Sequence, residues 1–221
     1  MTDGITTLSH FSILLFCFSI LLSQSFIPFL RRLLPTAATI ISLLMVDILQ
    51  WNAQSMNAHG CNFYESIITN ASNQEKPGII CIQETWYDEY NMLRFPNYHL
   101  VEKNRHDKRG GLAIYIHESI AFRVINTPDI NEYIIVDIYL QNNTFSLVNF
   151  YNPCKKIGQN LLDEIMKNCK EQVIVCGDFN SHNPLWGSNT LDVNGKTVED
   201  FMNKYDLVLL KGQVHPRKKL I

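Results

Sequence analysis

The residues best suited to acid–base chemistry follow an apolar run at positions 173–176. That run is β-branched and has the length of a strand buried on both faces, and Gly177 ends it. Asp178, Asn180 and His182 come next. A carboxylate held just past a buried strand faces the loop side, where α/β proteins usually keep their chemistry. Asp and Asn beside glycine also cap strands by bonding their own backbone, so this stretch alone leaves catalysis and a simple turn both open.

Other expected strands also deliver a polar side chain at or just after their ends. These side chains are Asn52 after residues 46–51, Glu84 after residues 79–82, and Tyr151 at the end of residues 144–151. One such coincidence would carry little weight, but four strand ends with polar groups favour a common site. Tyr151 taken alone would be an ordinary partly buried tyrosine.

Together these side chains suit the hydrolysis of a phosphodiester or phosphomonoester. Mg²⁺ usually takes only one or two protein carboxylates and keeps several waters, so Glu84 is its natural ligand, with the carbonyl of Asn52 beside it. Asp178, oriented by Asn180, could take a proton from an attacking water, which is worth on the order of 10² to 10⁴ in rate. Tyr151 could donate to a phosphate oxygen where charge develops.

The elements that must position these groups alternate between β and α patterns. Strands are expected at residues 112–117, 120–125, 133–140, 144–151 and 207–210, and the pair 133–140 and 144–151 has the pattern of a hairpin. Apolar residues at helical spacing predict helices over residues 61–72, 161–169 and 198–205. The fold class is therefore α/β.

Five motifs, taken in order, resemble the endonuclease/exonuclease/phosphatase superfamily. They are QWNAQS at 50–55, CIQETW at 81–86, the Arg109-Gly110-Gly111 turn, NFYNP at 149–153 and GDFNSHNPLWGS at 177–188. Within the superfamily they are most similar to the apurinic-endonuclease-like endonuclease domain of non-LTR, jockey-like retrotransposon reverse-transcriptase polyproteins. The resemblance covers about residues 46–210.

The resemblance implies a four-layer α/β sandwich, in which two β-sheets are flanked by helices, and a Mg²⁺ site that Mn²⁺ could also fill. It implies the same roles for Asn52, Glu84, Tyr151, Asp178 and Asn180, in an enzyme that nicks target DNA. Members of the family continue into a strand ending in Ile-Asp-Leu and then a Ser-Asp-His motif, whereas this sequence stops at Ile221. We therefore expect a domain that is incomplete at its C-terminus, and the loss of grouped site residues typically removes most activity. A non-catalytic remnant that binds DNA or sits at a membrane, or a phosphatase of the same superfamily, stays open beside the endonuclease.

A net charge of −2 points neither toward nor away from DNA, so contacts with it depend on local patches. The candidates are Arg105, Lys108 and Arg109 in one loop, Lys155 and Lys156 after the Tyr151 strand, and Trp186 for stacking on a base. Basic loops neutralise backbone phosphates with little sequence choice. Solvated loops and ordinary tryptophan packing are the alternatives. We expect the domain to act as a monomer.

The first 45 residues differ in composition from the rest, and we divide the chain into 1–45, an endonuclease-like domain at 46–211, and a basic tail at 212–221. Residues 11–30 carry no charge, about the length that crosses a bilayer, and Arg31 and Arg32 follow. The segment is therefore either a membrane anchor with the domain on the cytosolic side or a non-native extension. The six cysteines show no metal-site spacing and predict reduced thiols in an intracellular, and for a DNA enzyme nuclear, protein.

Overall fold

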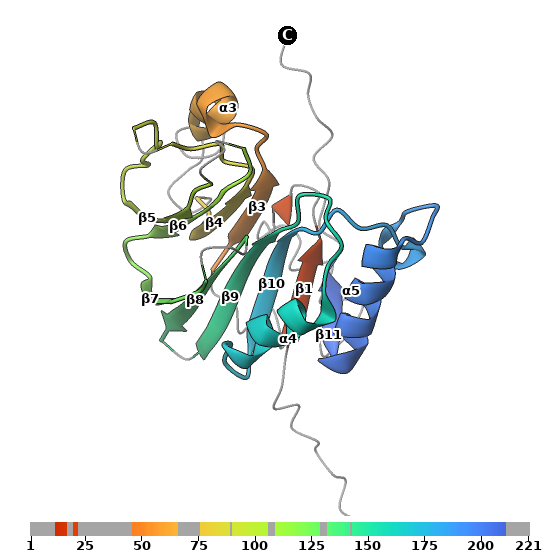
Figure 1. Ribbon diagram of the computed structural model, residues 1–221. Coiled ribbons are helices and arrows are strands. Elements are labelled where there is room, and N and C mark those ends of the chain that lie inside the picture. The colour runs from red at the N-terminus through yellow and green to blue at the C-terminus, as the bar shows by residue number, and fades with distance from the viewer. Residues whose placement is uncertain are drawn as a thin grey trace, which may run out of the picture.

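The chain folds into two β-sheets that pack face to face, with helices on the outer faces (Figure 1). The computed structural model describes residues 46–65, 76–88, 90–105, 109–128, 132–141 and 143–210, together with the backbone of 12–16 and 20–21. The expected α/β sandwich is confirmed.

The larger sheet has six strands in the order β11-β1-β10-β9-β8-β7. Their bounds are Leu207–Leu210, Ser12–Phe16, Val173–Asp178, Asn143–Tyr151, Tyr133–Leu140 and Ala121–Ile125. Strands β8 and β9 form the expected antiparallel hairpin, whereas β10 runs parallel to β9. The parallel pair brings the ends of β9 and β10 to the same edge of the sheet.

The smaller sheet has five strands in the order β2-β3-β4-β6-β5. Their bounds are Ile20–Leu21, Ile48–Asn52, Ile79–Gln83, Leu112–His117 and Tyr98–Lys103. Strands β3 and β4 are parallel and β6 is antiparallel to β4. The ends of β3 and β4 therefore also meet at one edge.

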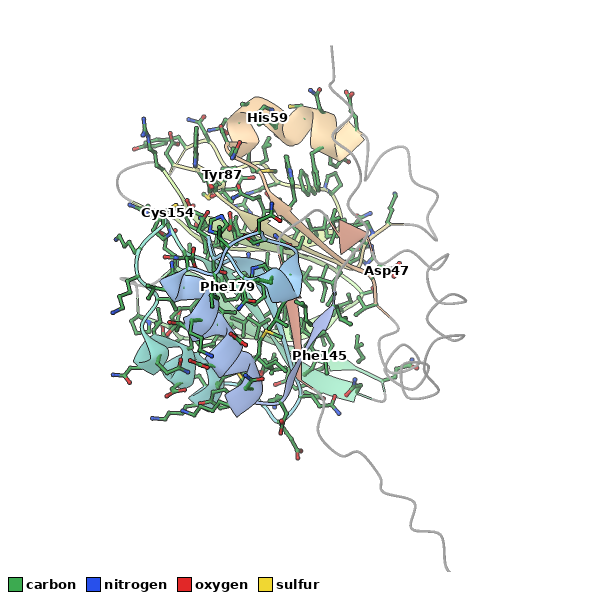
Figure 2. All side chains as sticks on the ribbon, turned by 90° about the vertical axis from the view of Figure 1, so that its right-hand side faces the viewer. Asp47, His59, Tyr87, Phe145, Cys154 and Phe179 are labelled. Atoms are coloured by element: carbon green, nitrogen blue, oxygen red, sulfur yellow. The ribbon has the colours of Figure 1, made fainter. Side chains whose placement is uncertain are left out.

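Three apolar layers hold the four structural layers together, and each follows from the alternation of side chains along the strands. The central layer lies between the sheets and includes Ile48, Ile114, Val136 and Leu147. On the outer face of the larger sheet, helices α4 (Gln159–Lys167) and α5 (Val193–Lys204) cover a second cluster. Helix α3 (Met56–Phe63) lies against the smaller sheet over a third cluster. In Figure 2, His59 on α3 lies at the top of the molecule, far from Phe145.

Helix α3 and strand β5 are two of the elements that differ from the predicted local structure. The helix expected over residues 61–72 begins earlier, at Met56, because the hydroxyl of Ser55 accepts a hydrogen bond from the Ala58 amide and caps it; residues 66–72 lie outside the described part. Strand β5 was not predicted at all. Its residues are only partly buried along an edge of the sheet, so they lack the apolar run that marks the other strands.

Most of the segment 1–45, and all of the tail 212–221, lie outside the described residues. Within that segment, β1 pairs in parallel with both β10 and β11, and β2 pairs with β3. Among the helices of the described ranges, none combines the length and the apolar character needed to cross a bilayer. The five cysteines in those ranges are free, in line with the expectation of reduced thiols.

Candidate active site

The two parallel strand pairs place the predicted polar residues at one end of the sandwich. Tyr151 and Asp178 are register partners at the ends of β9 and β10, and Asn52 ends β3 next to Gln83 of β4. Figure 2 shows Asp47, just before β3, on the right of the molecule, and Cys154, which follows β9, on the left. The strands that end at Asn52 and just before Glu84 belong to the smaller sheet, and those that end at Tyr151 and Asp178 belong to the larger one. The candidate site is therefore divided between the two sheets.

Asn52 joins the two halves through its side-chain amide. Its Nδ2 donates to Oε1 of Glu84 at 2.8 Å and to Oδ2 of Asp178 at 2.7 Å. The other carboxylate oxygen of Asp178 accepts a hydrogen bond from the backbone N–H of Asn180 at 3.0 Å. The five residues proposed from the sequence thus lie together, since Tyr151 is the register partner of Asp178 and the Glu84 carboxylate is near enough to raise the pKa of its phenol.

Tyr151 belongs to the central apolar layer between the sheets and is 9% exposed. Burial raises the pKa of its phenol well above the usual range, and the nearby carboxylates of Glu84, Glu132 and Asp178 act in the same direction. The hydroxyl therefore keeps its proton at any physiological pH and can serve as a hydrogen-bond donor.

Glu84 is held by its backbone in a conformation that few side-chain-bearing residues adopt. Its φ is 52°, in the left-handed region, which costs roughly 1 kcal/mol for a residue other than glycine. Its carbonyl accepts a hydrogen bond from Ser55 N at 2.9 Å, and the next amide, Thr85 N, donates to Gly111 O. The Gly110–Gly111 turn and the loop after β3 thus hold the backbone at Glu84 from both sides.

Several residues that fasten the site loops were not singled out from the sequence. Asn152, 5% exposed, donates from Nδ2 to the carbonyls of Lys155 and Phe179, and its own carbonyl accepts from Asn180 Nδ2 at 2.7 Å. Asn194 in the first turn of α5 donates to the carbonyls of Lys155 and Asn180. The only sequence signal for the role of Asn152 was the Asn152-Pro153 pair at a strand end. This pair indicates a turn but does not show which carbonyls the Asn152 side chain bonds.

Replacing Asn152 with alanine is expected to lower the free energy of unfolding by about 1 to 3 kcal/mol, because buried carbonyls lose their donor. The denaturant midpoint measures this. The control is Asn168→Ala, which removes an exposed amide that donates to the helix carbonyl of Glu164. Equal stability of the two variants would contradict the fastening role of Asn152.

The oxygen donors here are of the kind that hard divalent ions such as Mg²⁺ and Mn²⁺ take. Within the described ranges, no group of three or more His, Cys, Asp and Glu side chains could hold a metal. Mg²⁺ needs only one or two carboxylates and completes its shell with water. Glu84 can supply the carboxylate, and Asp178 can accept a hydrogen bond from water beside the ion. The amide oxygen of Asn52 accepts a hydrogen bond from Gln54 N at 3.3 Å, while the amide nitrogen faces the carboxylates. In this arrangement Asn52 holds the carboxylates together.

The basic residues predicted to meet a polyanion have different surroundings. Arg105 makes an ion pair of 2.6 Å with Glu132, whose other carboxylate oxygen accepts from Gly111 N, so its guanidinium supports the glycine turn. Arg109, Lys155 and Lys156 are exposed, and Lys108 lies outside the described residues.

Trp186 lies in a short 3₁₀ turn, Pro184–Trp186, which comes after the loop that follows strand β10. Its indole N–H donates to the carbonyl of Ser181 at 3.0 Å, and its ring packs against the cluster beneath α4 and α5. The packing role is therefore what the structure displays, and stacking on a base stays a prediction.

Comparisons with known proteins agree with this architecture. Residues 133–219 match the sequence model of a family described as endonuclease-reverse transcriptase. Among solved structures, the endonuclease domain of TRAS1, a telomere-specific non-LTR retrotransposon, superposes with a TM-score of 0.56 at 21% identity, over 72% of this chain and 71% of that one. The resemblance inferred from the five motifs is confirmed, and at this identity the structural match establishes the fold.

The human Nocturnin catalytic domain with bound sulfate also matches, with a TM-score of 0.40 at 18% identity over 61% of this chain and 64% of that one. No curated protein matches the sequence. The chain has the endonuclease-like α/β sandwich, a fold that suits a nuclease-type hydrolase.

Proposed function

We propose that the protein is a Mg²⁺-dependent DNA endonuclease, a phosphodiester hydrolase that nicks one strand. The observation that carries the proposal is the hydrogen-bonded set Glu84, Asn52, Asp178 and Asn180, in which two carboxylates share one amide donor where the two sheets meet. Tyr151 stands beside this set as the register partner of Asp178. A purely structural polar cluster would not need two carboxylates side by side, because like charges at such a distance repel.

Each of these residues has a role in hydrolysis that its contacts support. Glu84, with Asn52 beside it, would hold Mg²⁺, or Mn²⁺ in its place, and the bound ion would neutralise charge on a phosphate oxygen. Asp178 accepts the proton of the attacking water, and the Asn180 N–H orients its carboxylate. Tyr151, kept protonated, donates to a non-bridging phosphate oxygen.

DNA is the proposed substrate because of the surface around this edge. Lys155 and Lys156 are exposed just past the end of β9, and the backbone of Lys155 is fixed by Asn152 and Asn194. Such lysines give affinity for the phosphate backbone with little sequence choice. A substrate of this kind places the protein where DNA is, in the nucleus.

The test is nicking of supercoiled plasmid by the full chain with Mg²⁺, with and without a chelator, beside Glu84→Gln. The glutamine keeps the shape of Glu84 and an oxygen for Asn52, but removes the charge that would attract the ion. We expect the parent to nick only with Mg²⁺, and the variant to need a much higher Mg²⁺ concentration.

Circular dichroism checks that both proteins are folded. Nicking that persists in the chelator would contradict the metal dependence. A folded parent that binds plasmid without nicking it would overturn the proposal in favour of a non-catalytic DNA-binding module. Release of phosphate from small phosphoesters without nicking would assign the site to a phosphatase.

A further inference from the structure

Three fully buried amides form a chain between the two sheets, directly beneath the candidate site. Gln50 Nε2 donates to Gln83 Oε1 at 2.6 Å, and Gln83 Nε2 donates to Asn149 Oδ1 at 2.6 Å. The exposed fractions of these residues are 1%, 0% and 0%. We call this chain the amide ladder.

The ladder ends in two hydrogen bonds that join one sheet to the other. Asn149, in β9 of the larger sheet, donates from Nδ2 to the carbonyls of Ile82 and Ala113, both at 3.0 Å. Ile82 belongs to β4 and Ala113 to β6 of the smaller sheet. One side chain of one sheet therefore bonds the backbone of two adjacent strands of the other.

The position of the ladder relates it to the site above it. Gln50 precedes Asn52 by two residues on β3, and Asn149 precedes Tyr151 by two residues on β9, so each pair shares a face of its strand. Gln83 directly precedes Glu84. Below the ladder the inter-sheet layer is apolar, with Ile79, Cys81 and Leu147 among its members.

Apolar side chains could fill this layer at lower cost, since a buried amide must keep every hydrogen bond to offset its desolvation. What apolar contacts lack is direction: the hydrophobic effect is not directional, whereas hydrogen bonds are. A directional interaction is needed where two packed sheets must keep a fixed position relative to each other. The site is such a place, because Glu84 and Asn52 come from one sheet and Asp178 and Tyr151 from the other.

We propose that Asn149 and Gln83 are positioning residues, and that the amide ladder sets the register of the two sheets and thereby the distance between the carboxylates of Glu84 and Asp178. The inference rests on the proposed function, because it assigns the ladder a role in the same reaction. Neither residue touches substrate in this role. They act through the strands that carry the reacting groups.

The principal variant is Asn149→Leu, which keeps the branched shape and removes the bonds to Gln83, Ile82 and Ala113. We expect kcat for plasmid nicking to fall by about 10²-fold, since a misplacement of reacting groups by about 1 Å costs that much. KM for the plasmid should stay unchanged, because exposed lysines away from the ladder hold the DNA. A merely structural role would lower the denaturant midpoint and leave kcat of the folded fraction intact.

Ser146→Ala is the matched control. Ser146 lies on the same strand β9, is equally buried, and donates to Oδ1 of Asp137 at 2.7 Å. It lies on the opposite face, toward the helices, and at a greater distance along the strand from Tyr151. This variant should lose stability and keep both kinetic constants. If Asn149→Leu does not fold, Gln83→Leu is measured in its place. This variant removes the hydrogen bond between Gln83 and Asn149, keeps those of Asn149 to the carbonyls of Ile82 and Ala113, and should lower kcat by a smaller factor.

A second measurement does not depend on activity. Mn²⁺ bound at Glu84 should broaden the NMR signals of nearby backbone amides, Thr85 on the smaller sheet's side and Asn180 on the larger sheet's side. In Asn149→Leu the broadening of Asn180 should weaken relative to that of Thr85. Equal broadening in parent and variant, or an unchanged kcat, would overturn the ladder's role alone. A parent that shows no Mn²⁺ effect at either amide would overturn the proposed metal site, and the ladder's role with it.

Discussion

Replacing Asp178 with alanine is expected to lower Mg²⁺-dependent nicking by about 10² to 10⁴-fold at saturating metal and DNA. Asp178 is the carboxylate proposed to take the proton of the attacking water, and alanine has no acceptor in its place. The effect should fall on kcat, since the side chain is not expected to hold DNA in the ground state. Single-turnover nicking of plasmid, at several Mg²⁺ concentrations, measures it.

The same substitution separates this role from that of Glu84. Adding Mg²⁺ should restore much of the activity of Glu84→Gln but none of that of Asp178→Ala, because only the first weakens the attraction for the ion. Asp163→Ala serves as the control, since this carboxylate lies on α4, paired with Lys204. Rescue of Asp178→Ala by Mg²⁺ would show that Asp178 is a metal ligand and would reassign the base.

The site could be anticipated because its residues follow strands that are apolar on both faces. Runs such as 79–82 and 173–176 identify buried strands with little ambiguity, and their polar successors then stand at strand ends. The register of β9 with β10 and of β3 with β4 made these ends meet. What no strand pattern indicates is the left-handed backbone of Glu84, which depends on hydrogen bonds to loops distant in sequence.

The support beneath the site escaped prediction for a similar reason. Gln50, Gln83 and Asn149 are single polar residues in strands, and only the packing of one sheet on the other shows that they bond each other. Arg105 shows the same limit: its loop is rich in basic residues and predicts a phosphate contact, but the sequence does not indicate the ion pair that it makes with Glu132, which is distant in sequence. Local composition predicts charge but not its partner.

Replacing Gly177 with alanine is expected to destabilise the fold by roughly 3 kcal/mol or more. A Cβ at this position would lie 1.9 Å from the carbonyl oxygen of Phe150 and 2.7 Å from its carbonyl carbon. These are backbone atoms of the neighbouring strand β9, so no side-chain rotation can relieve the clash. The φ of 152° is also one that residues with a Cβ rarely adopt. Relief would require β9 and β10 to separate at the point where Tyr151 and Asp178 stand side by side.

Gly158→Ala is the matched control, because a Cβ there meets nothing within 4 Å. Chemical denaturation should show a large fall in midpoint, or no cooperative transition, for Gly177→Ala and almost none for Gly158→Ala. Residual folded Gly177→Ala should also nick more slowly, since the strained register moves Asp178 away from Asn52. A variant as stable as the parent would mean that β9 and β10 can part without cost, and the close pairing of these strands would then not be what positions the two halves of the site.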